Sequence, residues 1–509
     1  MKLLKNNLLF SLIFSIVIIV PNFIFNYYVE NFYIFNDKHT IQEIIITFVL
    51  GFLISLLEDK KKIFFITFFI ILNFIDIGYF SFFRIHLPPY QIELIFSEYK
   101  DILDSLYSIK EIVLLLFFAL FILLFLFIKL NKIKTETNRY VFYFLITLLI
   151  AFPIIIRKHT LNYMPNSTHF GFINTLFSFE IFISNKLFNS YKKEKFKPYI
   201  IKKSDTQKPI VIVIMGESLN YKRMSLFGFE YNTTPLLDSL KGDKNFIYKK
   251  AISSGVNTPV GVASFFYLKR EPKNIDLILS QKTNLLKLAK DNNYTTYWLS
   301  MQEEGTGIFP LLNQSDVVKT KKDFKYQYDE NLLKELKKID FSKKSFVVFH
   351  LRANHSPYEE YTPNKFYKWR FDYKNYHKYK LFSYLDSVLY VDYIVYNIID
   401  YMKNHHKNFV IYFVSDHSEM LGFEDEQKKY GHSQLTFGDT YIPFLYYSDK
   451  YHKELNQNFY NHYLISKMVA KDIGYKVINP NEKSDIYYIN NVKIDGRSGF
   501  IEYNLSKIK

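Results

Sequence analysis

No cysteine occurs among the 509 residues of this sequence. Without cysteine the chain cannot form a disulfide, a cysteine-ligated zinc site or a thiol nucleophile, so a metal site or a nucleophile must use other side chains. The absence of disulfides is compatible with export, because a large exported domain does not depend on them. The sequence also lacks internal repeats and recognition motifs for nucleic acid, which argues against a nucleic-acid-binding function.

Apolar runs are concentrated in the first third of the chain, whereas Lys, Asp, Glu and Asn dominate the remainder. Because about 20 apolar residues span a bilayer, several of these runs are long enough to be transmembrane helices. The five candidate blocks are Leu8–Val29, Ile41–Leu57, Ile63–Phe83, Ile112–Leu130 and Tyr140–Ile156. No small-x-small cleavage pattern follows the first block, so we expect it to remain as an anchor rather than to be removed as a signal peptide.

Basic residues flank these blocks on one side of the predicted membrane. The three clusters are Lys2 with Lys5, Lys60 with Lys61 and Lys62, and Lys129 with Lys132, Lys134 and Arg139. Because positive charge marks the cytoplasmic side, five spans place everything after residue 157 outside the cytoplasm. We therefore expect a transmembrane domain at residues 1–157, an interfacial helix and basic linker at 158–208 and an exported soluble domain at 209–509, in a monomeric chain.

The predicted linker region carries two signs of contact with a membrane surface. Apolar residues recur at rough helical spacing between Thr168 and Asn189, which predicts a helix lying in the interface. The chain has a formal net charge of +16, and a run of lysines follows this helix. These lysines are Lys192, Lys193, Lys195, Lys197, Lys202 and Lys203. Such a run is typical either of a segment that binds anionic lipid headgroups or of a solvated linker.

The soluble part alternates apolar, β-branched runs with amphipathic segments. The predicted strands are Ile210–Met215, Thr295–Leu299, Phe346–His350 and Phe409–Val414. Polar, lysine-rich segments between them, such as Asp329–Lys338 and Tyr384–Lys403, predict helices. Strand, helix and strand in succession indicate right-handed crossovers and a mostly parallel sheet, so the fold class is α/β.

Polar side chains follow several of these strands at the point where each strand ends. Glu217 comes directly after the first strand and its Gly216, and Asp416 and His417 follow the strand Phe409–Val414. The carboxyl ends of parallel strands meet at one edge of a sheet, which is where open α/β sheets bind ligands. Carboxylate and imidazole ligands suit zinc. Taken singly, Glu217 could be a solvated loop acid and the Asp-His pair a structural hydrogen bond, but their convergence favours a metal site.

Two further histidines and a threonine belong to the same prediction. His355 lies in the loop after the strand Phe346–His350, and His432 lies in the sequence YGHSQL. Pro259 suits the first position of a helix, which would make Thr258 the N-cap with its hydroxyl at a phosphate-binding helix end. A threonine hydroxyl held there by zinc could attack phosphorus and carry a covalent intermediate. The alternative is that Thr258 only caps a helix.

The ordered set of motifs resembles the membrane-bound phosphoethanolamine transferases, which belong to the alkaline phosphatase and sulfatase superfamily. The motifs are Glu217 in GES, the segment MSLFGFEYNTTPLLDSL, Thr258 in NTP, His355 in NHSPY, Asp416 and His417 in SDHSEMLG, His432 in GHS and the late IPFLYY. The resemblance extends over the five predicted spans and the soluble domain. It departs from the many members with disulfide-linked catalytic domains, because this chain has no cysteine.

The resemblance implies a set of roles for these residues. Zinc would be bound by Glu217, Thr258, Asp416 and His417, the phosphoethanolamine group would be carried by Thr258, and the phosphate site would be lined by His355 and His432. It implies an enzyme of the bacterial inner membrane with its catalytic domain in the periplasm. The donor would be phosphatidylethanolamine and the acceptor lipid A or another envelope glycan, whose identity the sequence does not indicate.

Three alternatives can be compared with this interpretation. A sulfatase of the usual type needs a C/S-x-P-x-R motif, whereas this chain has Thr258-Pro259-Val260-Gly261-Val262. Lipoteichoic acid synthases, which transfer glycerol phosphate, also combine five spans with a threonine, although the segment MSLFGFEYNTTP fits the phosphoethanolamine transferases better. A non-catalytic membrane scaffold is disfavoured because all four metal-site residues are present.

A candidate site for the donor headgroup lies between the third and fourth blocks. Glu93, Ser97 and Asp101 recur at intervals of four residues, which places them on one face of a helix. The ethanolamine ammonium would bind such an acidic face, and family members are thought to bind the donor with polar residues of a corresponding helix. The alternative is an ordinary solvated helix face.

Overall fold

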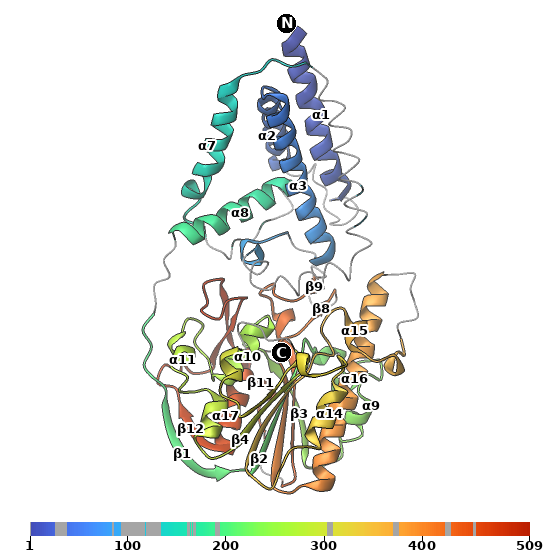
Figure 1. Cartoon of the computed structure of the whole chain (residues 1–509), viewed down its shortest axis with the longest axis vertical. Helices are drawn as coiled ribbons and strands as arrows, with labels where there is room; N and C mark the ends of the chain where they lie inside the picture. The colour runs from blue at the N-terminus through green and yellow to red at the C-terminus, as the bar shows by residue number, and fades with distance from the viewer. Residues whose placement is uncertain are drawn as a thin grey trace. The chain divides into compact units, whose positions relative to one another are not determined.

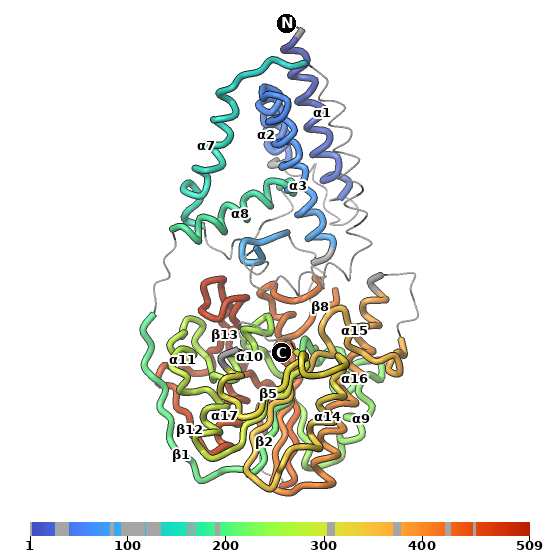
Figure 2. The backbone as a smooth tube through the Cα atoms, viewed as in Figure 1, coloured from blue at the N-terminus to red at the C-terminus, as the bar shows by residue number. Residues whose placement is uncertain are grey.

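A computed structural model divides the chain into two compact units (Figure 1, Figure 2). Unit 1 comprises Met1–Tyr191 with Gln427–Tyr430, and unit 2 comprises Lys192–Glu426 with Gly431–Lys509. The structure describes residues 2–25, 38–83, 86–92, 134–159, 169–188, 194–302, 309–369, 376–422, 429–450 and 455–508, together with residues 114, 118, 163 and 165.

Unit 1 is built from helices. Their bounds are α1 Lys2–Phe25, α2 Lys38–Ser55, α3 Asp59–Phe83, α7 Arg139–Ile155 and α8 Gly171–Phe188. Within the described residues, two helices are long and apolar enough to cross a bilayer, at Leu3–Phe25 and Asp59–Ser81, rather than the five that the sequence predicted. The second and fifth predicted blocks correspond to the shorter apolar helices α2 and α7. The fourth block, Ile112–Leu130, lies outside the described residues apart from positions 114 and 118.

Helix α8 begins at a point where α1, α2 and α3 each supply a side-chain oxygen. Asn22 Oδ1 accepts a hydrogen bond from the Gly171 N–H (2.9 Å), Asn73 Oδ1 from Phe172 (3.1 Å) and Glu43 Oε2 from Phe170 (3.4 Å). These bonds satisfy donors that every helix leaves open at its first turn. A β-carbon on Gly171 would lie 2.8 Å from the Asn73 carbonyl oxygen, so glycine permits this close approach.

The buried side of α8 is largely polar. Its buried side chains include Asn174, Thr175, Ser178 and Ser184, whereas Leu187 is exposed. Thr175 donates to the Leu72 carbonyl and Ser178 to the Leu87 carbonyl. Small polar side chains that hydrogen-bond across helices are characteristic of packing among membrane helices. The segment is therefore helical as predicted, and small polar side chains are buried beside Phe172 and Ile181.

Unit 2 is organised around an eight-stranded sheet of order β11-β3-β10-β7-β2-β6-β4-β5. The strands are β2 Ile210–Gly216, β3 Phe246–Ile252, β4 Thr295–Ser300, β5 Val317–Lys319, β6 Ser345–His350, β7 Phe409–Ser415, β10 Tyr441–Ser448 and β11 Phe459–Asn461. The run β5-β4-β6-β2-β7 is parallel, and β10 pairs antiparallel with both β7 and β3. The predicted α/β class with a mostly parallel sheet is confirmed.

Helices cover both faces of this sheet (Figure 1). One side carries α9 Pro235–Asp238, α14 Glu330–Leu336 and α16 Tyr376–His405, and the other carries α10 Thr258–Phe266 and α17 His462–Asp472. Helix α12 Leu285–Lys290 contacts α17 and β4. The middle strands read as continuous apolar runs because both of their faces are buried.

The remaining elements of unit 2 are short. They are the helices α11 Asp276–Leu279, α13 Phe309–Leu312 and α15 Tyr358–Tyr361 and the strands β1 Ile200–Gln207, β8 Met420–Leu421, β9 Tyr430–Gly431, β12 Ile473–Ile478, β13 Ile486–Asn490 and β14 Phe500–Asn504. Strand β1 includes Lys202 and Lys203 and pairs antiparallel with β12, so this part of the basic segment is a strand of unit 2. The sequence did not predict it, because an exposed polar strand has no apolar periodicity.

Candidate metal and nucleophile site

The candidate site forms where β2 and β7 end side by side. These strands are parallel neighbours, and Gly216 at the end of β2 is paired with Ser415 at the end of β7. The next residues along the two strands are Glu217 on one and Asp416 with His417 on the other. All three side chains are fully or almost fully buried. Adjacent parallel strands therefore bring together residues that lie about two hundred positions apart in the chain.

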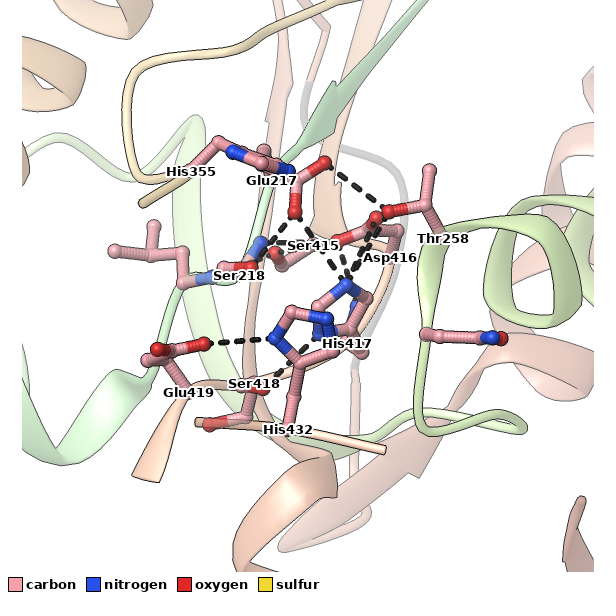
Figure 3. Close-up of polar contacts among 12 residues, drawn as sticks. Glu217, Ser218, Thr258, His355, Ser415, Asp416, His417, Ser418, Glu419 and His432 are labelled. Atoms are coloured by element: carbon pink, nitrogen blue, oxygen red, sulfur yellow. Dashed lines mark hydrogen bonds and ion pairs between the residues drawn. The ribbon is translucent and has the colours of Figure 1, made fainter. Parts of the chain in front are cut away.

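The three side chains converge closely enough to hold a single cation (Figure 3). One ligand atom from each of Glu217, Asp416 and His417 lies within 4.8 Å of the others. His417 Nε2 lies 3.4 Å from Glu217 Oε1 and 3.4 Å from Asp416 Oδ2. Backbone N–H groups of Ser218 and His417 donate to Asp416 Oδ1, so the other oxygen is aimed into the cluster.

Electrostatics in the cluster are set by burial and by mutual interaction of the charged groups. Burial and the Glu217 carboxylate raise the pKa of Asp416 to about 6. Burial would lower the pKa of His417, but Asp416 and Glu217 raise it to about 10. Burial would raise the pKa of Glu217, but the hydrogen bond and charge of His417 hold it well below its usual range. The two carboxylates thus require a positive charge between them.

A divalent metal fits this set of donors. Within the part of the chain that the structure describes, Asp416 Oδ2 is buried and makes no hydrogen bond, and His417 Nε2 lies 3.4 Å from it. Such burial is costly for a carboxylate oxygen unless a cation is bound there. Two carboxylates, one imidazole and a neighbouring hydroxyl match the oxygen and nitrogen ligands of catalytic zinc sites with an open position. Glu217, Asp416 and His417 are therefore the residues that could hold such an ion.

The Thr258 hydroxyl lies beside this cluster. Its Oγ1 donates to Glu217 Oε2 at 3.2 Å and lies 3.3 Å from His417 Nε2. The close approach of α10 depends on Gly261, because a β-carbon there would lie 2.1 Å from the Asp416 carbonyl oxygen. The start of α10 is thereby pressed against the end of β7.

Thr258 is not the N-cap of α10 as the sequence predicted. Asn257 is the N-cap, and its side-chain oxygen accepts a hydrogen bond from the Val260 N–H, whereas Thr258 is the first residue of the helix. An Asn side chain satisfies the first-turn donors as well as a threonine does. The capping function is therefore supplied by the neighbouring residue, and the Thr258 hydroxyl is directed to the cluster instead.

The predicted histidines lie close to the cluster in different ways. The His432 ring packs on the His417 ring with centroids 4.3 Å apart, and His432 Nδ1 lies 2.9 Å from Glu419 Oε2. Glu419 also accepts a hydrogen bond from the Tyr358 hydroxyl (2.8 Å), so its carboxylate is held in place. His355 lies beside Glu217 (Figure 3), its charge contributes to the lowered pKa of Glu217, and its Nδ1 is 2.6 Å from the Ser356 carbonyl oxygen.

Gln302 is a site residue that the sequence analysis missed. Its Nε2 donates to both Glu217 Oε2 and the Leu351 carbonyl at 2.7 Å, and Arg352 Nη1 donates to its Oε1. A carbonyl can only accept and a guanidinium can only donate, so these two partners fix the orientation of the amide. Gln302 thereby orients the Glu217 carboxylate. It follows strand β4, so the strand-end rule that identified Glu217 would also have identified Gln302.

Glu419 was also missed, because its role depends on His432, which lies 13 residues further along the chain. The proposed headgroup residues Glu93, Ser97 and Asp101 lie outside the described residues. Their role stays a prediction.

Phosphoethanolamine transferase EptC of Escherichia coli is 27% identical over 325 residues, which are 55% of this chain and 55% of the relative, so the chain spans about half the length of that relative. The crystal structure of the E. coli EptC periplasmic domain in complex with zinc has a TM-score of 0.52 and 23% identity, and covers 62% of this chain and 98% of that one.

A second solved structure extends the likeness in fold across both units. It is the integral membrane protein lipooligosaccharide phosphoethanolamine transferase A from Neisseria meningitidis, with a TM-score of 0.61 and 16% identity over 92% of this chain and 95% of that one. At these identities both structures show a shared fold. The family model for sulfatases matches residues 209–470, which is just over half of the chain and includes every residue of the cluster. This chain therefore belongs to the sulfatase family.

Proposed function

We propose that this chain is a zinc-dependent phosphoethanolamine transferase that moves phosphoethanolamine from phosphatidylethanolamine to lipid A or another envelope glycan. The observation that carries the proposal is the position of Thr258. Its hydroxyl is at the start of a helix and within 3.3 Å of two of the three clustered ligand residues. A hydroxyl so placed suits covalent catalysis at phosphorus. The relatives named as phosphoethanolamine transferases support this choice of group over sulfate or glycerol phosphate.

Two in-line exchanges make up the proposed reaction. In the first, Thr258 Oγ1 forms a bond to the donor phosphorus, and the bond from phosphorus to the diacylglycerol oxygen breaks. Glu217 accepts the hydroxyl hydrogen bond of Thr258 and so directs its lone pair. In the second, an oxygen of the acceptor attacks phosphorus, the bond to Thr258 breaks and Thr258 regains its proton. Zinc held by Glu217, Asp416 and His417 would lower the pKa of this hydroxyl and stabilise charge on the phosphoryl oxygens.

His432 is placed to act as the general acid that protonates the leaving group. The contact between His432 Nδ1 and Glu419 Oε2 orients the His432 ring against His417. The opposite edge of the ring therefore faces away from Glu419. In the first exchange the Thr258 proton passes to solvent, and protonated His432 gives a proton to the diacylglycerol oxygen. In the second exchange His432 takes the proton of the acceptor hydroxyl and solvent returns a proton to Thr258, so protons balance and His432 is restored. His355, on the Glu217 side of the cluster, would hold the phosphoryl oxygens.

The proposal is tested by the covalent adduct. Full-length protein in vesicles of phosphatidylethanolamine should gain one phosphoethanolamine group by intact mass, and Thr258→Ala should gain none. Thr258→Ser keeps a hydroxyl and should still form the adduct. Because Asn257 caps the helix, Thr258→Ala should change the free energy of unfolding by less than about 1 kcal/mol. An adduct on Thr258→Ala, or full transfer by that variant, would refute the covalent mechanism.

The proposed location is the bacterial inner membrane, with several spans and the catalytic domain on the exported side. It is supported by the apolar helices of unit 1 and by the one-sided basic clusters. Reporter fusions after Lys62 and Arg139 should indicate cytoplasm, and a fusion after Lys203 the exported side. An exported signal at Arg139 would contradict this orientation.

A further inference from the structure

Unit 1 contains a cavity of about 430 Å³ that the proposed chemistry does not use. Helices α2, α3, α7 and α8 line it, and most of its wall is apolar. Its apolar wall includes Leu50 of α2, Phe65 and Phe69 of α3 and Leu149 of α7. The volume lies within the range of about 300–1,000 Å³ that is usual for small-molecule sites. The cavity is large enough for a ligand rather than for a single water.

One end of the cavity is polar. Glu43 of α2 and His169, which precedes α8, line this end, and His169 Nδ1 lies 2.8 Å from Glu43 Oε1. The Glu43 side chain is 6% exposed and that of His169 is 32% exposed. Ile46 and Leu50 follow Glu43 on the same helix, and Leu50 lies about 10 Å further along the axis at 1.5 Å per residue. The cavity therefore has the polarity of an amphiphile, with an acidic head end and an apolar interior.

The cavity also opens onto an apolar outer surface. Two of its lining residues, Ile46 of α2 and Leu148 of α7, are 50% and 46% exposed. Neighbouring positions on the same helices, such as Ile45 and Ile150, are exposed as well. An apolar cavity does not hold water well, and an empty one loses packing contacts in proportion to its volume. An apolar cavity that opens on an exposed apolar surface fits a lipid chain entering from the side.

We propose that this cavity binds one acyl chain of a phospholipid whose headgroup carries a primary ammonium, and that Glu43 binds the ammonium. Glu43 already contacts His169 Nδ1 through Oε1 and the Phe170 N–H through Oε2. A carboxylate has about four acceptor positions, so Glu43 can also accept from an ammonium group, and an ionisable side chain buried among apolar helices is expected to have a functional role. The inference rests on the proposed function to the extent that unit 1 lies in a membrane. The site differs from the predicted headgroup residues Glu93, Ser97 and Asp101, so it is a second point of lipid contact.

The test measures lipid retention without turnover. Full-length Thr258→Ala is reconstituted with equal amounts of phosphatidylethanolamine and phosphatidylglycerol, extracted into mild detergent, and the bound lipid is identified by native mass spectrometry. Leu149→Trp fills the cavity and should lower retention by about tenfold or more. Ile150→Trp is the matched control, because Ile150 is 71% exposed on the same helix and does not line the cavity. Leu50→Phe narrows the cavity from α2 and provides a second, milder variant.

A substitution at Glu43 tests whether this carboxylate binds the ammonium of the headgroup. Glu43→Gln keeps an acceptor for the Phe170 N–H but removes the charge, so it should retain lipid and lose the preference for phosphatidylethanolamine. Equal retention of both lipids by the parent protein would overturn the ammonium assignment. Unchanged retention in both Leu149→Trp and Leu50→Phe would overturn the cavity site. All of these variants carry Thr258→Ala, and the bound lipid is identified as intact phosphatidylethanolamine or phosphatidylglycerol, so retention is read in the same way whether or not the transferase proposal holds.

Discussion

The outer surfaces of the two units differ, although each unit buries an apolar core. On α1 of unit 1, Leu8, Leu12, Ile16, Val20 and Ile24 recur every four residues and are exposed. The buried polar residues of the same helix are Asn7, Ser11, Ser15 and Asn22. Asn22 donates to Asn73 Oδ1 of α3, and Asn7 to Ser55 Oγ of α2, so these polar groups are paired across helices.

Unit 2 has the usual pattern of a water-soluble domain. Its large exposed apolar side chains, within the described residues, are Ile200, Leu279, Val318, Tyr326 and Phe500. The strand residues Ile212, Ile214, Val347 and Phe349 are fully buried. The difference shows that the same chain folds against two kinds of solvent. Where the surroundings are apolar, polar groups must pair inside the unit, and where the surroundings are water, apolar groups collect inside.

The largest expected effect concerns the metal cluster, which belongs wholly to unit 2. Asp416→Asn removes one charged ligand and should weaken metal binding by more than about a hundredfold, measured by competition with a chromophoric chelator. Asp392→Asn is the matched control, because Asp392 is equally buried but accepts hydrogen bonds from the N–H groups of Leu236 and Leu237. The helix content of unit 1 should be the same in both variants. Equal metal affinity in both variants would show that Asp416 is not a ligand.

The next effect tests the comparison of the two units directly. Ile16→Lys places a charge on the exposed apolar face of α1, and Leu279→Lys places one on an exposed apolar residue of unit 2. If unit 1 lies in lipid, the first should cost about 3 kcal/mol in folding free energy. The second should stay within about 0.5 kcal/mol. Unfolding of both variants in the same bicelles measures the two changes in folding free energy. Equal changes would contradict an apolar environment around the surface of unit 1.

A smaller effect is expected at Gln302. Gln302→Leu leaves the Glu217 carboxylate without the donor that orients it and should weaken metal binding by about 10- to 100-fold. Gln281→Leu removes a comparable amide that bonds to Tyr267 and Asn284 instead, and should leave metal affinity unchanged. A loss of stability without a change in metal affinity would show that Gln302 acts only in folding.

Predictions from the sequence were most accurate where a signal is local. The four strands were located to within one residue at each end. Short runs rich in β-branched and aromatic residues are typical of strands, and β2 and β7 read as apolar runs because both of their faces are buried. The convergence of Glu217 with Asp416 and His417 followed from one further rule, that parallel strands end at one edge. The N-cap at Thr258 was wrong, because Asn257 and Thr258 are both good caps and sequence alone does not choose between them.

By itself, the sequence determined the α/β class, the position of the buried strands and the set of side chains available for chemistry, because each depends on residues close together in the chain. Tertiary structure alone decided that α10 lies against β7, that the Thr258 hydroxyl meets Glu217 41 residues away and that Gln302 orients the same carboxylate from 85 residues away. It also decided which side of α8 is buried. These outcomes depend on packing between segments distant in sequence, where a single missing β-carbon, as at Gly261, permits the contact.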